Sequence, residues 1–203
     1  VRTQADGRAY DDFYYDLNGQ QVQCSGGYYG IHYEYNAEGQ STSLIFLDED
    51  GHAVCISSGY AIKTYQRDGN GTVVIEQFFD AEGNPARSLL GQYGELYQRD
   101  AQGYIGQITY LDADGNPAPT NAGYTILKRT YHRDGTADTD MYFDADGNPK
   151  ALSKGQYGIK RSGKVNLLLD KNGHVMRCVD NILNRFPFMV VIFGCVICLL
   201  ILV

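Results

Sequence analysis

The sequence predicts an all-β protein, a solenoid-like array of five tandem 32-residue β-hairpin units followed by one C-terminal transmembrane helix. Three observations predict it. Glycine and aspartate recur at one fixed period, tyrosine (17) and glycine (24) are abundant without any tryptophan, and the segment 186–203 carries no charge. Aromatic runs between regularly spaced Gly and Asp clusters are typical of short strands separated by turns.

The repeat is visible as four ladders of residues at one period. Two ladders form an acidic turn: Asp16, Asp48, Asp80, Asp112 and Asp144, with Gly19, Gly51, Gly83, Gly115 and Gly147. Two more consist of glycine alone: Gly27, Gly59, Gly91, Gly123 and Gly155, and Gly39, Gly71, Gly103 and Gly135. They predict a repeat domain over 14–175, with units near 14–45, 46–77, 78–109, 110–141 and a shortened 142–175. A lead-in (1–13) precedes it, and a juxtamembrane linker (176–185) and the membrane helix (186–203) follow.

The chemistry of the turns explains the ladders. In the fourth unit, Asp112 to Gly115 is a turn and Tyr124 to Tyr131 a strand. Thr136 to Phe143 is the returning strand, after another turn at the hairpin tip. Asp at the first turn position accepts a hydrogen bond from a backbone N–H two residues on, and Gly at the last position adopts a positive φ without steric cost. We expect type I turns with a bulge. A calcium loop of the EF type needs Gly at its sixth position and Glu at its twelfth, whereas Gly comes fourth here, so no metal site is predicted.

Tyrosines between units are the candidate ligand-binding residues. One unit cannot bury its aromatic side chains alone, and stacked neighbours can, so most rings are expected to form the core between units. Rings left exposed could stack on sugar rings, because they offer a flat apolar face and a polar tip. The candidates are Tyr28, Tyr60, Tyr93, Tyr124 and Tyr157.

Charge is distributed unevenly along the chain. Residues 1–149 contain 9 basic and 22 acidic residues, a net charge of −13, and residues 150–185 contain 8 basic and 2 acidic residues, a net charge of +6. The acidic part should repel nucleic acid. The basic part favours an anionic lipid surface, or is simply a solvated face.

Catalytic and metal-binding motifs are missing from the sequence. The five cysteines form no zinc pattern, and Cys24 and Cys55 either face each other in adjacent units or stay unpaired. The four histidines are scattered, and the acidic turns make carboxylate pairs too common to be informative. We therefore predict a non-enzymatic protein without a cofactor.

The segment 186–203 is long enough to cross a membrane. As a helix it would span about 27 Å, close to the thickness of the hydrocarbon core. Asn184 suits the N-cap and Pro187 the first turn. Arg177 and Arg185 flank its N-terminal side, which by the positive-inside tendency favours a cytoplasmic repeat domain with a tail anchor.

The motif Tyr-Leu-Asp-Ala-Asp-Gly-Asn-Pro at 110–117, repeated with Phe at 142–149, resembles the hairpin repeats of bacterial cell-surface proteins of the choline-binding and glucan-binding class. Those families have a shorter period and Trp-lined ligand sites, so no ligand residue is carried over. The segment from Gly59 to Tyr65 is more similar to 32-residue repeats found beside membrane segments in Firmicutes proteins, including VanZ-like ones. This resemblance implies an extracytoplasmic module.

These expectations combine into one leading function. The chain is predicted to be a membrane-anchored extracytoplasmic repeat module that binds a cell-wall polysaccharide or a surface protein, or acts as a spacer. The alternative is an accessory ectodomain of a larger multi-pass membrane enzyme or transporter.

Overall fold

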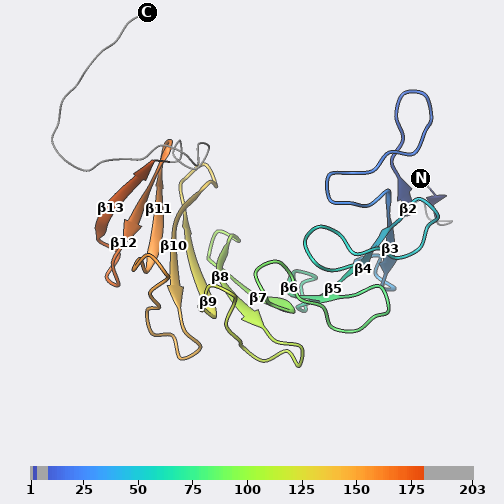
Figure 1. The fold of residues 1–203 in the computed structure, drawn as a ribbon. Helices are drawn as coiled ribbons and strands as arrows, with labels where there is room; N and C mark the ends of the chain where they lie inside the picture. The colour runs from blue at the N-terminus through green and yellow to red at the C-terminus, as the bar shows by residue number, and fades with distance from the viewer. Residues whose placement is uncertain (1, 4–8, 181–203) are drawn as a thin grey trace, which may run out of the picture.

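The computed structural model describes residues 2–3 and 9–180, and shows a single open antiparallel sheet (Figure 1). Its 13 strands follow one another in chain order, so every strand pairs with its sequence neighbours. The strands are β1 (Arg2–Thr3), β2 (Ala9–Phe13), β3 (Gly30–Tyr35), β4 (Ser41–Leu47), β5 (Ile62–Arg67), β6 (Val73–Phe79), β7 (Gly94–Arg99), β8 (Ile105–Leu111), β9 (Ile126–Tyr131), β10 (Ala137–Phe143), β11 (Gly158–Ser162), β12 (Val165–Leu169) and β13 (Val175–Asp180). The all-β prediction is confirmed.

The sheet forms a curved, twisted ribbon in which β2 and β3 lie at one end and β11 to β13 at the other (Figure 1). Strands twist relative to their neighbours by roughly 20–25°, and the curvature accumulates over the array. The sheet extends past both predicted limits of the repeat domain. Strand β2 lies in the predicted lead-in, and β13 occupies much of the predicted linker.

The first four hairpins keep the same register. Ile31 pairs with Phe46 in β3–β4, Lys63 with Phe78 in β5–β6, and Leu127 with Tyr142 in β9–β10. Each of these hairpins also has a register shift beside its tip. Such a bulge increases the local twist, and it recurs with the repeat.

Two turns lie in the long connection between successive hairpins, and a third forms the hairpin tip. In the connection from β4 to β5, Gly51 N donates to Asp48 O at 3.2 Å and Gly59 N donates to Ile56 O at 2.9 Å. Both glycines have a positive φ, 87° and 97°, which other residues adopt only with strain. The turn that ends at Gly59 is called the second turn below, and its equivalents are 24–27, 88–91, 120–123 and 152–155.

Aromatic rings form a row across the sheet beneath the second turns. This aromatic ladder alternates two positions that each recur once per unit: Tyr14, Phe46, Phe78, Tyr110 and Tyr142 at one, and Tyr28, Tyr60, Gln92, Tyr124 and Gln156 at the other. Successive ring centroids are 4.6–6.0 Å apart from Tyr14 to Phe78 and 4.8–5.4 Å apart from Tyr110 to Tyr142. Ladder rings form the larger part of the two hydrophobic clusters of the core, together with Ile31, Ile56 and Leu127.

Two further predictions concern the membrane helix and the pairing of cysteines. Within residues 2–3 and 9–180, no helix has the length and apolar character needed to traverse a bilayer. The predicted membrane helix, 186–203, lies outside the described residues. Cys24, Cys55 and Cys178 are free thiols, so Cys24 and Cys55 do not form a disulfide.

Candidate functional site

The acidic turns are built as the sequence predicts. In the turn that starts at Asp48, one carboxylate oxygen accepts hydrogen bonds from the N–H groups of Asp50 (3.0 Å) and His52 (2.8 Å). These backbone bonds, above all that from His52, hold the pKa of Asp48 below its ordinary value. The same hydrogen bonds recur at Asp16, Asp80, Asp112, Asp144 and Asp170.

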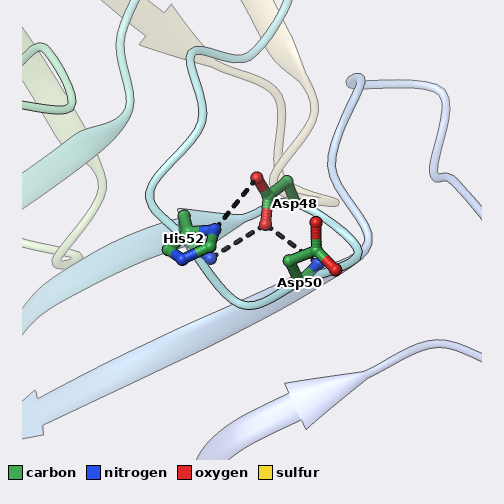
Figure 2. Close-up of side chains that lie close together, drawn as sticks. All are labelled: Asp48, Asp50 and His52. Atoms are coloured by element: carbon green, nitrogen blue, oxygen red, sulfur yellow. Dashed lines mark hydrogen bonds and ion pairs between the residues drawn. The ribbon is translucent and has the colours of Figure 1, made fainter.

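Asp48, Asp50 and His52 form a group whose potential ligand atoms all lie within 4.8 Å of one another (Figure 2). Their position on one turn explains this proximity, since Asp48 Oδ1 is engaged by two backbone N–H groups and His52 Nδ1 lies 3.7 Å from Asp48 Oδ2. Asp50 and His52 are exposed. The turn accounts for the cluster, and we assign no metal to it.

The five candidate tyrosines do not converge on one site. Tyr60 and Tyr124 are buried in the aromatic ladder, at 8% and 7% exposure, and Tyr28 packs against the same core. Tyr93 and Tyr157 stand one residue past the ladder position and are half-buried. Tyr93 Oη accepts a hydrogen bond from Arg87 Nε at 3.1 Å. Second-turn residues pack against the ladder, Ile56 in the cluster of Tyr60 and Leu152 against the cluster of Tyr124. The candidate rings are therefore mostly core residues.

Grooves lie instead between neighbouring hairpin tips. Groove I, of about 610 Å³, lies between the tips of β3–β4 and β5–β6 and is lined by residues that include Asn36, Glu38, Gln40, Tyr65, Arg67 and Asp68. Groove II, of about 770 Å³, lies between the tips of β7–β8 and β9–β10 and is lined by Asp100, Gln102, Tyr104, Arg129, Thr130, Tyr131, His132 and Arg133. All of these positions except Thr130 correspond, two repeat periods earlier, to residues that line groove I. The two grooves are therefore equivalent sites two units apart.

Groove II contains an aromatic pair. Tyr104 and Tyr131 stack with centroids 4.8 Å apart and an interplanar angle of 26°. Tyr131 Oη donates to Ile105 O at 2.9 Å, which fixes the ring between the two hairpins. Tyr104 is 38% exposed, so part of its ring faces solvent beside polar groups. This combination of an apolar ring and hydrogen-bonding side chains suits a hydroxylated ligand.

Groove I replaces the aromatic pair by polar side chains. Gln40 stands where groove II has Tyr104, and Arg67 where it has Tyr131. Arg67 donates to Ser41 O and to Gly71 O, both at 2.9 Å, and thus joins neighbouring hairpins as Tyr131 does. Groove I therefore offers hydrogen bonds and the single ring of Tyr65, without a stacked aromatic pair.

An ion-pair network holds Arg129, one of the residues that line groove II. Arg129 binds Asp140 through two hydrogen bonds of 2.6 and 2.9 Å, and Arg161 donates to the same carboxylate at 2.6 Å. Burial opposes ionisation of Asp140, but the hydrogen bonds from Arg129 and Arg161 outweigh it and hold the pKa below its usual value. The two hydrogen bonds to Asp140 compensate the charge of Arg129 and fix its side chain in one wall of the groove.

A second polar network interrupts the aromatic ladder at Gln92. Ser88 Oγ donates to Gln92 Oε1 at 2.7 Å, Gln92 Nε2 donates to Glu95 at 2.8 Å, and Tyr97 Oη donates to Glu95 at 2.9 Å. Glu95 pairs across strands with Glu76, which binds Lys63 Nζ at 3.0 Å. Burial raises the pKa of Glu95 above its ordinary value. The hydrogen-bonded partners of these groups explain their burial without a ligand.

No protein-family model matches the chain, and no curated protein matches it. Among solved structures, the chain is similar at 21% identity to part of an alternansucrase in complex with isomaltononaose. The match has a TM-score of 0.15 and covers 85% of this chain but only 15% of that one. Similarity at this level indicates neither a shared fold nor a shared function.

Proposed function

We propose that the chain is a non-enzymatic repeat module that binds a surface polysaccharide through the grooves between its hairpin tips. The observation that supports this best is the recurrence of equivalent grooves, I and II, two units apart along the sheet. Two equivalent open sites along one sheet suit a ligand that itself repeats. We propose Tyr104 and Tyr131 as the residues that contact the ligand, in place of the five candidate tyrosines, because Tyr60 and Tyr124 are buried.

The spacing of the grooves favours a long ligand. They are separated by four strands, which at about 4.8 Å per strand corresponds to roughly 19 Å along the sheet. The twist of the sheet rotates one groove relative to the other, so a polymer that occupies both has to follow the ribbon. Binding at two linked sites raises the overall affinity above that of either site.

Attachment to a membrane belongs to the same proposal. The uncharged segment 186–203 would anchor the module, and the net charge of +6 over 150–185 would lie next to anionic lipid headgroups. A surface polysaccharide ligand requires the repeat domain to lie outside the cytoplasm, whereas the positive-inside tendency of Arg177 and Arg185 favours the opposite orientation. An impermeant thiol reagent that labels Cys55 in intact cells would agree with the extracytoplasmic orientation, because Cys55 is exposed, and labelling only after lysis would contradict it.

The experiment that tests the binding function is a glycan array probed with the full chain in nanodiscs, with empty nanodiscs as the control. We expect saturable binding to a subset of polysaccharides that Tyr104→Ala weakens. The matched control is Tyr15→Ala, since Tyr15 is 55% exposed and lies outside both grooves. An absence of binding to every polysaccharide by folded protein would contradict the proposal.

A further inference from the structure

The second turns of successive units are joined by backbone hydrogen bonds. Ser57 N donates to Gly26 O at 2.8 Å, Leu89 N to Ser58 O at 3.0 Å, and Asn121 N to Leu90 O at 2.7 Å. The next bond in this series would run from Ser153 N to Ala122 O, and it is absent from the backbone bonds of residues 9–180. The stack of second turns is therefore open between units four and five.

The contacts of the second-turn glycines differ along the array. A Cβ atom added to Gly59 would lie 2.5 Å from Arg87 O in the following unit. One added to Gly123 would have only Lys150 Cε within 4 Å, at 3.6 Å. Units two and three are thus in close contact at this glycine. Gly27 has nothing within 4 Å although its turn is hydrogen-bonded to the next, so the opening between units four and five is shown by the absent hydrogen bond and not by the glycine contacts.

The aromatic ladder ends at the same place. Gln156 occupies the position that Tyr124 fills one unit earlier. Leu168 pairs with Ile159 as Tyr142 pairs with Leu127, so Leu168 is the shortened unit's counterpart of Tyr142. Two consecutive ring positions of the ladder therefore hold smaller, non-aromatic side chains.

A cavity of about 360 Å³ lies at this position. Its lining includes Leu152, Gln156, Ile159, Asn166, Leu168 and Val179. Gln156 is 8% exposed, and its Oε1 atom has no hydrogen-bond partner within the described part of the chain. An unpaired buried amide oxygen costs free energy unless a donor reaches it. The cavity therefore combines this acceptor with aliphatic side chains (Leu152, Ile159, Leu168 and Val179) and polar ones (Asn121, Ser153, Lys154 and Asn166).

The other Gln of the ladder provides an internal comparison. Gln92 stands at the same repeat position, but Ser88 and Glu95 satisfy its amide, and the second turns on both sides of it are hydrogen-bonded. Replacement of Tyr by Gln therefore does not by itself leave an unpaired amide. The opening of the turns and the small side chain of Leu168 distinguish the site at Gln156.

We infer that the cavity at Gln156 is a binding site for a single hydroxylated six-membered ring. The ring would take the place of the missing ladder tyrosine, pack against the aliphatic side chains of the lining and donate its hydroxyl hydrogen to Gln156 Oε1. A phenol and a pyranose share this chemistry. The inference is independent of the grooves at the hairpin tips, since none of the cavity's lining residues belongs to either groove.

The test is a methyl NMR titration of the full chain in nanodiscs with p-cresol, and separately with methyl β-glucopyranoside. We expect one of these probes to shift the methyl signals of Leu152, Ile159 and Leu168 saturably, with a dissociation constant on the order of 1 mM for so small a ligand. The methyl signal of Ile62, far from the cavity in the second unit, should not move. Shifts with p-cresol identify an aromatic ring as the ligand, and shifts with the glucoside alone identify a sugar.

Three variants make the test specific. Gln156→Tyr should fill the cavity and abolish binding, and Gln156→Leu should weaken binding about fivefold because the acceptor is lost. Gln92→Leu is the matched control and should leave the titration unchanged. The inference is overturned if neither probe shifts the three methyl signals in protein whose spectrum shows it to be folded, or if Gln156→Tyr binds as well as the unmodified chain.

Discussion

Tyr104 and Tyr131 come from different hairpins, and their rings stack at 4.8 Å across the boundary between units three and four. The contact joins the two tips and leaves part of Tyr104 exposed in groove II. One pair of residues thus contributes both to the array and to the proposed binding surface, and variants must separate the two roles.

Tyr104→Ala is expected to weaken polysaccharide binding about tenfold, because an aromatic contact contributes roughly 0.5–1.5 kcal/mol beyond its buried area. Gln40→Ala, at the equivalent position of groove I, should have a smaller effect, since it removes no ring. Isothermal titration calorimetry measures both. Equal losses for the two variants would show that stacking on Tyr104 is not the principal contact.

Tyr60→Ala should destabilise the sheet by about 3 kcal/mol, the usual cost of truncating a large buried side chain. Tyr60 stacks on Phe78 at 4.6 Å and lies in the core. Tyr15→Ala, at an exposed position, should change stability by less than about 0.5 kcal/mol. Urea denaturation compares them, and similar costs would contradict the placement of Tyr60 in the core.

Glu95→Gln is expected to stabilise the protein at pH 7 by about 0.5–1 kcal/mol, because it removes a like-charge cross-strand pair with Glu76. Burial raises the pKa of Glu95 in the folded state. Ionised Glu95 therefore destabilises the folded state at neutral pH, and this cost disappears once the residue is protonated in both the folded and unfolded states. The gain should therefore disappear near pH 4. Glu76→Gln is the control and should not stabilise, because it breaks the ion pair with Lys63.

Acid should destabilise the array through its turns. The pKa values of Asp16, Asp48, Asp80, Asp144 and Asp170 are lowered in the folded state, mainly by hydrogen bonds to the turn. A lowered pKa contributes stability that is present above the ordinary value of 3.8 and is lost as the pH falls below it. The melting temperature should therefore decrease as the pH is lowered below about 4. The decrease should be less steep after Asp48, Asp80 and Asp144 are replaced by Asn. If the melting temperature of this variant depends on pH as steeply as that of the unmodified chain, the acid sensitivity belongs to other groups.

The turns could be predicted from the sequence because their chemistry is local. Each Asp reaches backbone N–H groups two and four residues on, and each Gly supplies a positive φ at its own position. The repeat period then fixes the order of hairpins, and a β-meander follows from the short tips. Strand β13 was not predicted because it follows the last acidic turn, Asp170 to Gly173, where the repeat ends. Within the described residues it is an edge strand that pairs with β12.

The grooves could not be predicted in the same way. Tyr104 and Tyr131 lie in different units of the chain, and their contact depends on the register of four strands and on the bulge beside each tip. The burial of Tyr60 and Tyr124 depends on packing by second-turn residues such as Ile56 and Leu152. One signal was present in the sequence: Tyr104 and Tyr131 depart together from the residues at their repeat positions, Thr72 and Arg99 one unit earlier.

The most direct test of the proposed function compares a long polysaccharide with a short oligosaccharide of the same repeat, using the full chain and its groove variants. If grooves I and II bind one polymer together, the chain should bind the polysaccharide at least about tenfold more tightly than the oligosaccharide. Tyr104→Ala combined with Arg67→Ala should remove this advantage, while Tyr104→Ala alone should remove part of it. Equal affinity for the two ligands, or an advantage that persists in the double variant, would contradict two-groove binding.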